Sequence, residues 1–326
     1  MIRKLSVIIL TYNADWNKLR ATLQSILDQR FVDYEIVFAD DGSRVKWNDR
    51  LEEVMAGRPS IPWRFADSPE NVGTVKNAYN ALNAARGEYA KLISPGDCLY
   101  DPDVLGKWIA FMEQTGAKVS FGKVVYYSAD PCIQLHPIMT QPNLPSLYDD
   151  PKLRPVLFVD YLVNMDYILG ASVLVKRDVM LEYLAPLVGH VVYEEDSFMR
   201  LMVYAGEPLH WFPELAVWYE FGVGISTGNN DTWLKRLNMD DVNGDRRLRE
   251  VLGTPCALAR RFNVWLSLMP KPGLWRKIVK LALFPWLLKL KRIRKKERRY
   301  APTDVPTDYL ATLLGLHEEA SDETCK

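Results

Sequence analysis

Over the first hundred residues, short apolar runs alternate with stretches in which apolar residues recur every three or four positions. The apolar runs predict strands over residues 5–10, 34–38, 63–66 and 89–93. The helical spacing predicts helices over residues 19–27, 45–55 and 75–85, and Gly87 is expected to stop the last of them. Strands that alternate with helices favour a parallel sheet covered by helices, so the expected fold class is α/β.

The remaining two thirds of the chain give a less regular pattern. Residues 119–127, 158–163 and 170–175 are predicted to be further strands, and a proline-rich connection covers residues 131–155. A long connection beside a ligand edge is more often functional than idle. From about Asp231 the pattern becomes helical, and the residues after Ala301 are polar, acidic and expected to be mobile.

Polar clusters follow three of the predicted strands. They are Thr11-Tyr12-Asn13, Asp40-Asp41-Gly42-Ser43 and Ser94-Pro95-Gly96-Asp97. Ligands of open parallel sheets bind at the carboxyl ends of the strands. We therefore expect the three clusters to converge on one rim of the sheet and to form a binding site there.

The acids of these clusters allow two interpretations. Asp97 suits a hard cation such as Mg²⁺ or Mn²⁺, because one or two carboxylates plus a diphosphate complete such a site. Asp40 and Asp41 could accept hydrogen bonds from a nucleobase or a ribose, with Tyr12 as a stacking ring. The alternative is structural, since Asp-Gly sequences form turns and Asp97 could shape the turn before the next helix.

A third acidic group, Glu194-Glu195-Asp196, precedes apolar residues at helical spacing. It could supply a general base for a hydroxyl group. It could equally be a helix N-terminus that favours acids, with Asp196 and Arg200 as an ion pair.

Other chemistries find little support in the sequence. The four histidines lack a metal-ligand spacing, and no P-loop or GxGxxG motif occurs. A glycine-rich stretch at residues 222–227, GVGIST, could fold over a phosphate group.

Charge is balanced overall but concentrated locally. The 326 residues carry 41 basic and 41 acidic side chains, so nothing points to nucleic acid as a partner. Residues 270–299, however, hold twelve lysines and arginines against Glu297 alone. Apolar residues and Trp275 and Trp286 recur within this basic segment, and a kinked helix is expected at Pro285. Basic amphipathic helices of this kind lie on anionic membrane surfaces, and a helix packed on the domain is the alternative.

The cysteines and the N-terminal sequence bear on the cellular setting. Four cysteines lie far apart without a CxxC pair, and the first residues lead into a strand instead of a signal peptide. No apolar run is long enough to span a bilayer. We predict a reducing, cytoplasmic setting on the inner face of the cell membrane.

Residues 4–228 resemble the family 2 inverting glycosyltransferases of the GT-A fold, especially bacterial enzymes that build surface polysaccharides. Five motifs stand in the family's order, namely VIILTYN at 7–13, SILDQRF at 25–31, EIVFADDGS at 35–43, the stretch from ENVGT to DCLY at 70–100, and YEEDSFMRL at 193–201. The resemblance implies a Rossmann-like, mostly parallel sheet in residues 1–228, a helical and basic extension in 229–300, and a polar acidic tail in 301–326.

The resemblance also implies a role for each site residue. Asp97 would bind Mg²⁺ or Mn²⁺, and Asp196 would be the catalytic base with Glu195 beside it. The nucleotide and its diphosphate would be held by Thr11, Tyr12, Asp40, Asp41, Asn71, Gly73, Lys76 and Gly96. One departure concerns the Asp-x-Asp-Asp motif of many relatives, of which only the final acid, Asp97, is present here.

The implied reaction moves a sugar with inversion from a nucleoside diphosphate sugar, such as a UDP-sugar, to a hydroxyl group of a glycan or lipid-linked saccharide. A non-catalytic descendant of the family that binds a nucleotide sugar or acts as a scaffold at the membrane is the alternative. The two predictions differ in whether Asp196 is required.

Overall fold

A computed structural model describes residues 3–140, 142–162, 166–222, 231–252, 278, 281–282 and 300–316. Its first part alternates strands and helices in the order that the apolar pattern predicts. The elements are β1 (Arg3–Thr11), α1 (Trp16–Leu27), β2 (Tyr34–Asp40), α2 (Asn48–Ala56), β3 (Trp63–Phe65), α3 (Thr74–Ala84) and β4 (Gly87–Ile93). These four strands are parallel to one another.

The second part completes the sheet with strands of both directions. They are β5 (Cys98–Leu99), β6 (Val119–Ser128), β7 (Gln134–Leu135), β8 (Val173–Lys176) and β9 (His210–Glu220). The strand order is β3-β2-β1-β4-β8-β6-β9-β5, with β7 paired to β6. Because β8 runs antiparallel to β4 and β6, the sheet is mixed beyond its first four strands.

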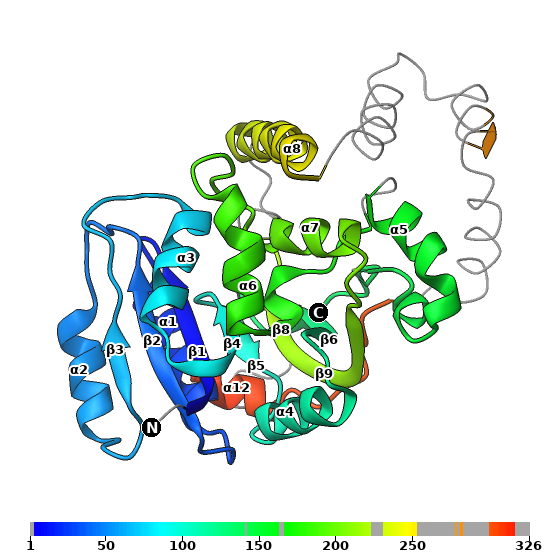
Figure 1. The fold of residues 1–326 in the computed structure, drawn as a ribbon. Coiled ribbons are helices and arrows are strands. Elements are labelled where there is room, and N and C mark those ends of the chain that lie inside the picture. The colour runs from blue at the N-terminus through cyan, green and yellow to red at the C-terminus, as the bar shows by residue number, and fades with distance from the viewer. Residues whose placement is uncertain are drawn as a thin grey trace.

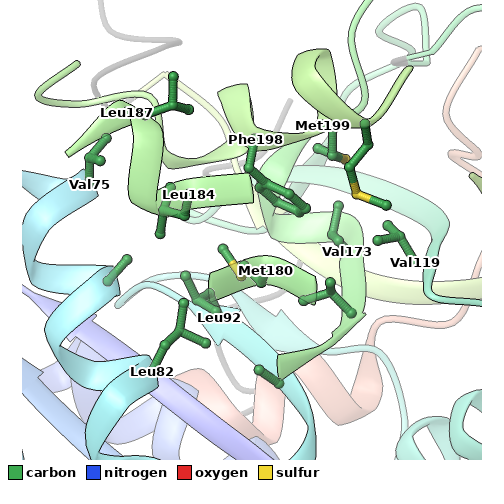
Figure 2. Close-up of a cluster of buried hydrophobic side chains, with 14 of the residues drawn as sticks. Val75, Leu82, Leu92, Val119, Val173, Met180, Leu184, Leu187, Phe198 and Met199 are labelled. Carbon is green, nitrogen blue, oxygen red and sulfur yellow. The ribbon is translucent and has the colours of Figure 1, made fainter. Parts of the chain in front are cut away.

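Helices cover both faces of this sheet, as Figure 1 shows. On one face, α3 packs with α6 (Arg177–Leu184) and α7 (Phe198–Tyr204), and their apolar side chains meet those of the strands in the cluster of Figure 2. On the other face, α1, α2 and α4 (Val104–Thr115) bury a second cluster around Trp108. The strands between the clusters are apolar on both sides, which is why they appear as continuous apolar runs.

Residues 158–163 were expected to form a strand, and this prediction is wrong. Residues Arg154–Leu162 form helix α5 instead, which follows two 3₁₀ turns, η1 (Pro145–Tyr148) and η2 (Pro151–Leu153). A short apolar run does not distinguish a strand from a buried helix. Here Val156 and Leu157 face an apolar cluster with Leu144 and Leu147, so packing on the loop decides the helix.

Gly87 does not stop the preceding helix, contrary to the prediction. Helix α3 ends at Ala84, and Gly87 is the first residue of β4. A Cβ atom at Gly87 would lie 2.4 Å from the backbone nitrogen of Ser6, so the glycine allows β4 to approach β1 closely. Strand β9 has no counterpart among the predicted strands, although it contributes eleven residues to the sheet.

The residues after Ala301 were expected to be mobile, which is wrong for residues 301–316. Helix α12 (Asp308–Leu314) buries Leu310 and Leu313 against Ala21 of α1, Cys98 and Trp218. The acidic composition of the tail concealed this apolar face of a single short helix.

Cys132 is disulfide-bonded while Cys98 is free and buried, so the cysteines do not support the reducing setting that we inferred.

Helix α8 (Asp231–Leu252) lies in the region predicted to be a helical extension, and it contacts α7 and the 3₁₀ turn η4 (Ala185–Leu187) (Figure 1). The glycine-rich stretch from residue 223 on, the domain boundary at residue 228 and most of the basic segment, with Pro285, lie outside the described residues. In the part of the chain that is described, no helix has the length and apolarity needed to cross a bilayer.

Candidate active site

The three polar clusters converge on one rim, as predicted. Thr11 pairs with Asp40 in the β1–β2 register, and Ile9 pairs with Ile93, so the three strands end side by side. A cavity of about 800 Å³ opens there, and its walls include Thr11, Asp41 and Asp97. This volume lies within the roughly 300–1,000 Å³ of typical small-molecule sites.

The β2 acids fix the backbone of the rim. Asp40 accepts hydrogen bonds from the Thr11 hydroxyl at 3.0 Å and from the Ser43 backbone N–H at 2.8 Å. Asp41 accepts the backbone N–H groups of Val72 and Gly73 at 2.7 and 3.0 Å. Burial raises the pKa of Asp41 above its ordinary value. Asp41 thus holds the loop before α3 while lining the cavity, whereas Asp40 does not reach the cavity wall.

Asp97 lines the cavity beside a second carboxylate, Glu220, which the sequence motifs did not indicate. Its Oδ1 accepts the backbone N–H of Glu220 at 3.2 Å, at the end of β9. Asp97 is 8% exposed, and burial is the main cause that raises its pKa to about 7. Gly96, with a φ of +101°, makes room for this arrangement, because a Cβ atom there would lie 2.3 Å from Oε2 of Glu220.

Two lysine side chains interact with these carboxylates. Lys18 of α1 donates to both carboxylate oxygens of Glu220 at 2.6 and 2.8 Å. Lys91 of β4 is fully buried and donates to the carbonyl oxygens of Leu92 and Ala171 at 2.8 and 2.6 Å. Burial lowers the pKa of Lys91 to about 7, against the attraction of Asp97 and Glu195. Lys91 is therefore attracted both to Asp97 and to Glu195.

Glu195 and Asp196 line the same cavity, on the 3₁₀ turn η5 (Glu195–Ser197) before α7. Burial raises the pKa of Glu195 to about 7, and the neighbouring Glu194 adds to the effect. Glu194 accepts a hydrogen bond from Arg200 at 2.6 Å and forms an ion pair with it. A Cβ atom at Gly170 would lie 3.1 Å from Oε1 of Glu195, which shows how closely the backbone packs on this acid.

The cavity wall is strongly acidic. Among the described residues it carries two basic side chains, Lys18 and Arg200, and seven acidic ones, Asp15, Asp41, Asp97, Glu194, Glu195, Asp196 and Glu220. Both basic groups already form ion pairs with glutamates. A polyanionic ligand would need a cation to enter this site.

The carboxylates of Asp97 and Glu220 fit one hard cation whose remaining coordination sites are taken by a ligand. Asp97 and Glu220 offer carboxylate oxygens from two neighbouring strand ends, which suits Mg²⁺ or Mn²⁺. In the described part of the chain, no group of three or more His, Cys, Asp or Glu side chains could hold a metal by itself. A bound ligand would have to complete the coordination.

The other predicted residues are divided between the cavity and its surroundings. Tyr12 is on the wall with half of its surface exposed, as a stacking ring requires. Asn71 and Lys76 are exposed at the start of α3 and, like Gly73 and Gly96, are not part of the described wall. From α3 the wall instead contains Thr74 and Asn77. Their position one helical turn apart in the motif was the signal that could have found them.

The chain is similar to known glycosyltransferases in both sequence and structure. Residues 6–162 match the sequence profile described as glycosyl transferase family 2. Over 159 residues the chain is 23% identical to an uncharacterized glycosyltransferase of Methanocaldococcus jannaschii, covering 41% of this chain. The chain spans about half of that relative's length, 54%.

Two solved structures have a similar fold. A mannosyltransferase of Pyrobaculum calidifontis in complex with GDP-Man and Mn²⁺ aligns with a TM-score of 0.51 and 14% identity, over 90% of this chain and 85% of that one. S. aureus TarS 1–349 in complex with UDP-GlcNAc aligns with a TM-score of 0.49 and 15% identity, over 82% and 76% of the two chains. At this identity the first comparison concerns the fold, and it confirms the expected GT-A-like α/β class.

Proposed function

The chain belongs to glycosyl transferase family 2, and we propose that it transfers a sugar from a nucleoside diphosphate sugar to a hydroxyl group of a glycan or lipid-linked saccharide. One observation carries the proposal. The fold brings Asp97 and the Glu195–Asp196 pair, which are about a hundred residues apart, to the wall of one cavity at the carboxyl ends of the strands. Sugar transfer needs a diphosphate site and a general base that reach the same bound substrates.

The donor nucleotide would occupy the part of the cavity next to β1 and α3. The exposed ring of Tyr12 can stack on a base, and Thr11 and Asp41 face the same space. Thr74 and Asn77 at the start of α3 add polar groups for a ribose. We propose a UDP-sugar as donor.

Asp97 would hold Mg²⁺ or Mn²⁺, with Glu220 as the second carboxylate. The ion would neutralise charge that develops on the leaving diphosphate. The protein supplies a cavity whose own basic side chains are engaged by Glu220 and Glu194, so these lysine and arginine groups do not replace a cation. The Lys18–Glu220 pair further keeps the Glu220 carboxylate in place beside Asp97.

Asp196 would act as the general base in a single displacement. It would accept the proton of the acceptor hydroxyl, whose oxygen then attacks the anomeric carbon while the nucleoside diphosphate leaves from the other side, giving inversion. Glu195, partly buried beside it, would shape the pocket and orient the acceptor. General bases contribute typically about 10² to 10⁴ in rate.

We also propose that the acceptor lies at the cytoplasmic face of the cell membrane, in cell-surface polysaccharide synthesis. The twelve basic side chains of residues 270–299 and their tryptophans support this proposal, because such segments bind anionic lipid surfaces. Replacement of these twelve lysines and arginines by glutamine should then abolish co-sedimentation with anionic vesicles.

The test is a donor panel with the purified full chain and Mn²⁺ or Mg²⁺. Release of nucleoside diphosphate from UDP-, GDP- and dTDP-sugars is measured with and without a membrane lipid extract. We expect release from one donor, a fall of roughly 10² to 10⁴ in Asp196→Asn with donor binding retained in a calorimeter, and loss in Asp97→Ala. Asp178→Asn, an exposed carboxylate of α6 paired with Arg177, serves as the matched control and should be unchanged.

The opposite results would contradict the proposal. Turnover that survives Asp196→Asn would exclude the assigned base. Nucleotide binding without release from any donor, in the presence of the lipid extract, would favour the non-catalytic alternative.

A further inference from the structure

One face of α8, in the helical extension, lies against the loop that leads to the acid pair. Asp240, Gly244 and Arg247 follow one another at helical spacing along this face. Arg247 donates to the carbonyl oxygen of Pro186 at 2.9 Å. One turn before Asp240, Leu237 reaches the wall of the cavity. The extension is therefore part of the surroundings of the active site.

The Asp240 carboxylate is the central contact of this face. It is 2% exposed. Both of its oxygens accept the backbone N–H of Val192 at 3.1 Å, and Oδ2 accepts the backbone N–H of Tyr193 at 2.6 Å. Charge-assisted hydrogen bonds of this kind are about twice as strong as neutral ones. Arg236 lies over the ring of Tyr193 at 5.8 Å. Two consecutive peptide groups are thus fixed immediately before Glu194.

The same loop is fixed from the opposite side by α3. The carbonyl oxygen of Val192 accepts the backbone N–H of Val75 at 3.0 Å. A Cβ atom at Gly73 would lie 2.4 Å from Cγ1 of Val192, and Gly73 itself is held by Asp41. A continuous set of hydrogen bonds therefore joins Asp41, the start of α3, Val192 and Asp240.

We propose that Asp240 is a positioning residue that sets the place of the Glu195–Asp196 pair relative to the start of α3, where the donor nucleotide would bind. It does so by holding Val192, which lies between the two. The helical extension therefore completes the active site instead of only attaching the chain to a surface. The catalytic part of this inference rests on the proposed function. The hydrogen bonds by which Asp240 holds Val192 and Tyr193, here called the clamp, can be measured without turnover.

The test compares three full-length variants with the wild type. Asp240→Asn keeps the size of the side chain but can accept fewer of the backbone N–H groups. Asp240→Glu keeps the carboxylate. Glu250→Gln is the matched control, since it removes one negative charge from the same helix at a residue paired only with Arg247 among the contacts described for it.

Two readouts are combined, namely steady-state kinetics and amide hydrogen exchange. We expect a fall of roughly 10- to 100-fold in kcat for Asp240→Asn with little change in donor KM, because small misplacements of a base cost this much. Peptides covering residues 190–196 should exchange at least about tenfold faster, while β1 and β4 remain protected. Asp240→Glu should recover part of both effects, and Glu250→Gln should match the wild type.

The outcomes separate this inference from the proposed function. Unchanged exchange of residues 190–196 in Asp240→Asn, or faster exchange with unchanged kcat, would overturn the inference. If Asp240→Asn fails to fold, the same criteria apply to Asp240→Glu, whose kcat must fall with KM unchanged and whose exchange must rise locally. A wild type without turnover would count against the proposed function, and the exchange comparison would still decide whether the clamp exists.

Discussion

Replacement of Asp97 by asparagine should stabilise the fold in the absence of divalent cations while it removes activity. The carboxylate is 8% exposed and lies beside Glu220, and burial raises its pKa from the ordinary 3.8 to about 7. Above pH 7 the native protein must therefore carry a buried negative charge at a cost. Asparagine keeps an oxygen that accepts the Glu220 backbone N–H but carries no charge.

The magnitude follows from the proton affinity. Each tenfold change in affinity is worth about 1.4 kcal/mol, so a rise from 3.8 to about 7 corresponds to at most roughly 4 kcal/mol. This upper limit already includes the attraction of Lys91, which acts against the rise in pKa. We expect about 1–3 kcal/mol for Asp97→Asn at pH 8. At about 2.1 cal/mol/K of unfolding entropy per residue, this raises Tm by roughly 2–4 °C.

The dependence on pH has a defined sign. Because the pKa of Asp97 is higher in the native than in the unfolded chain, the native protein binds more protons between pH 3.8 and about 7. Its contribution to stability therefore falls as pH rises through this window. The difference between Asp97→Asn and the wild type should be small at pH 4.5 and largest at pH 8.

The assay is thermal unfolding of both proteins in EDTA at several pH values, repeated with Mn²⁺ and nucleoside diphosphate. The ligands should stabilise the wild type and leave Asp97→Asn nearly unchanged, since binding to the native state raises Tm. If Asp97→Asn is no more stable than the wild type at pH 8, or if the difference does not grow with pH, the burial argument is refuted.

Two further substitutions test the packing around the site. Leu313→Ala should destabilise the protein by about 2–4 kcal/mol in denaturant unfolding, because Leu313 is 1% exposed, and no effect would mean that α12 is not part of the folded unit. Gly170→Ala should lower kcat with a nearly unchanged Tm, because the new Cβ would press on Glu195 and Asp196 at 3.1 and 3.2 Å; unchanged kinetics would mean that the acid pair tolerates displacement.

The family assignment shows what kinds of information the motifs contain. Three of the motifs join a strand end to a polar cluster, and the shared direction of the strands is enough to bring these clusters together at one rim. Asp41 and Asp97 reach the cavity wall in this way, whereas Asp196 reaches it on the turn before α7. Lys76 and Asn71 belong to the same motifs, yet Lys76 is exposed on α3 and Asn71 is exposed in the loop before it, and their roles stay predictions.

Long-range partners could not be read from the motifs. Glu220 lies 202 residues from Lys18 and reaches Asp97 because β9 is inserted between β6 and β5 in the sheet. Lys91 occupies a position inside a predicted strand. Its burial near Asp97 and Glu195 depends on the pairing of β8 with β4. Asp240 belongs to a polar helix whose docking face no local pattern marks.

The sequence by itself determined the alternation of strands and helices, the parallel half of the sheet and the rim where its acids meet. These depend on hydrophobic periodicity and strand direction, which are local properties. The tertiary structure decided that residues 154–162 form a helix, that α12 packs on α1, and which residues pair across the cavity. Those choices depend on which surfaces meet in the complete fold, because an apolar run or a charged helix face can be buried in more than one way.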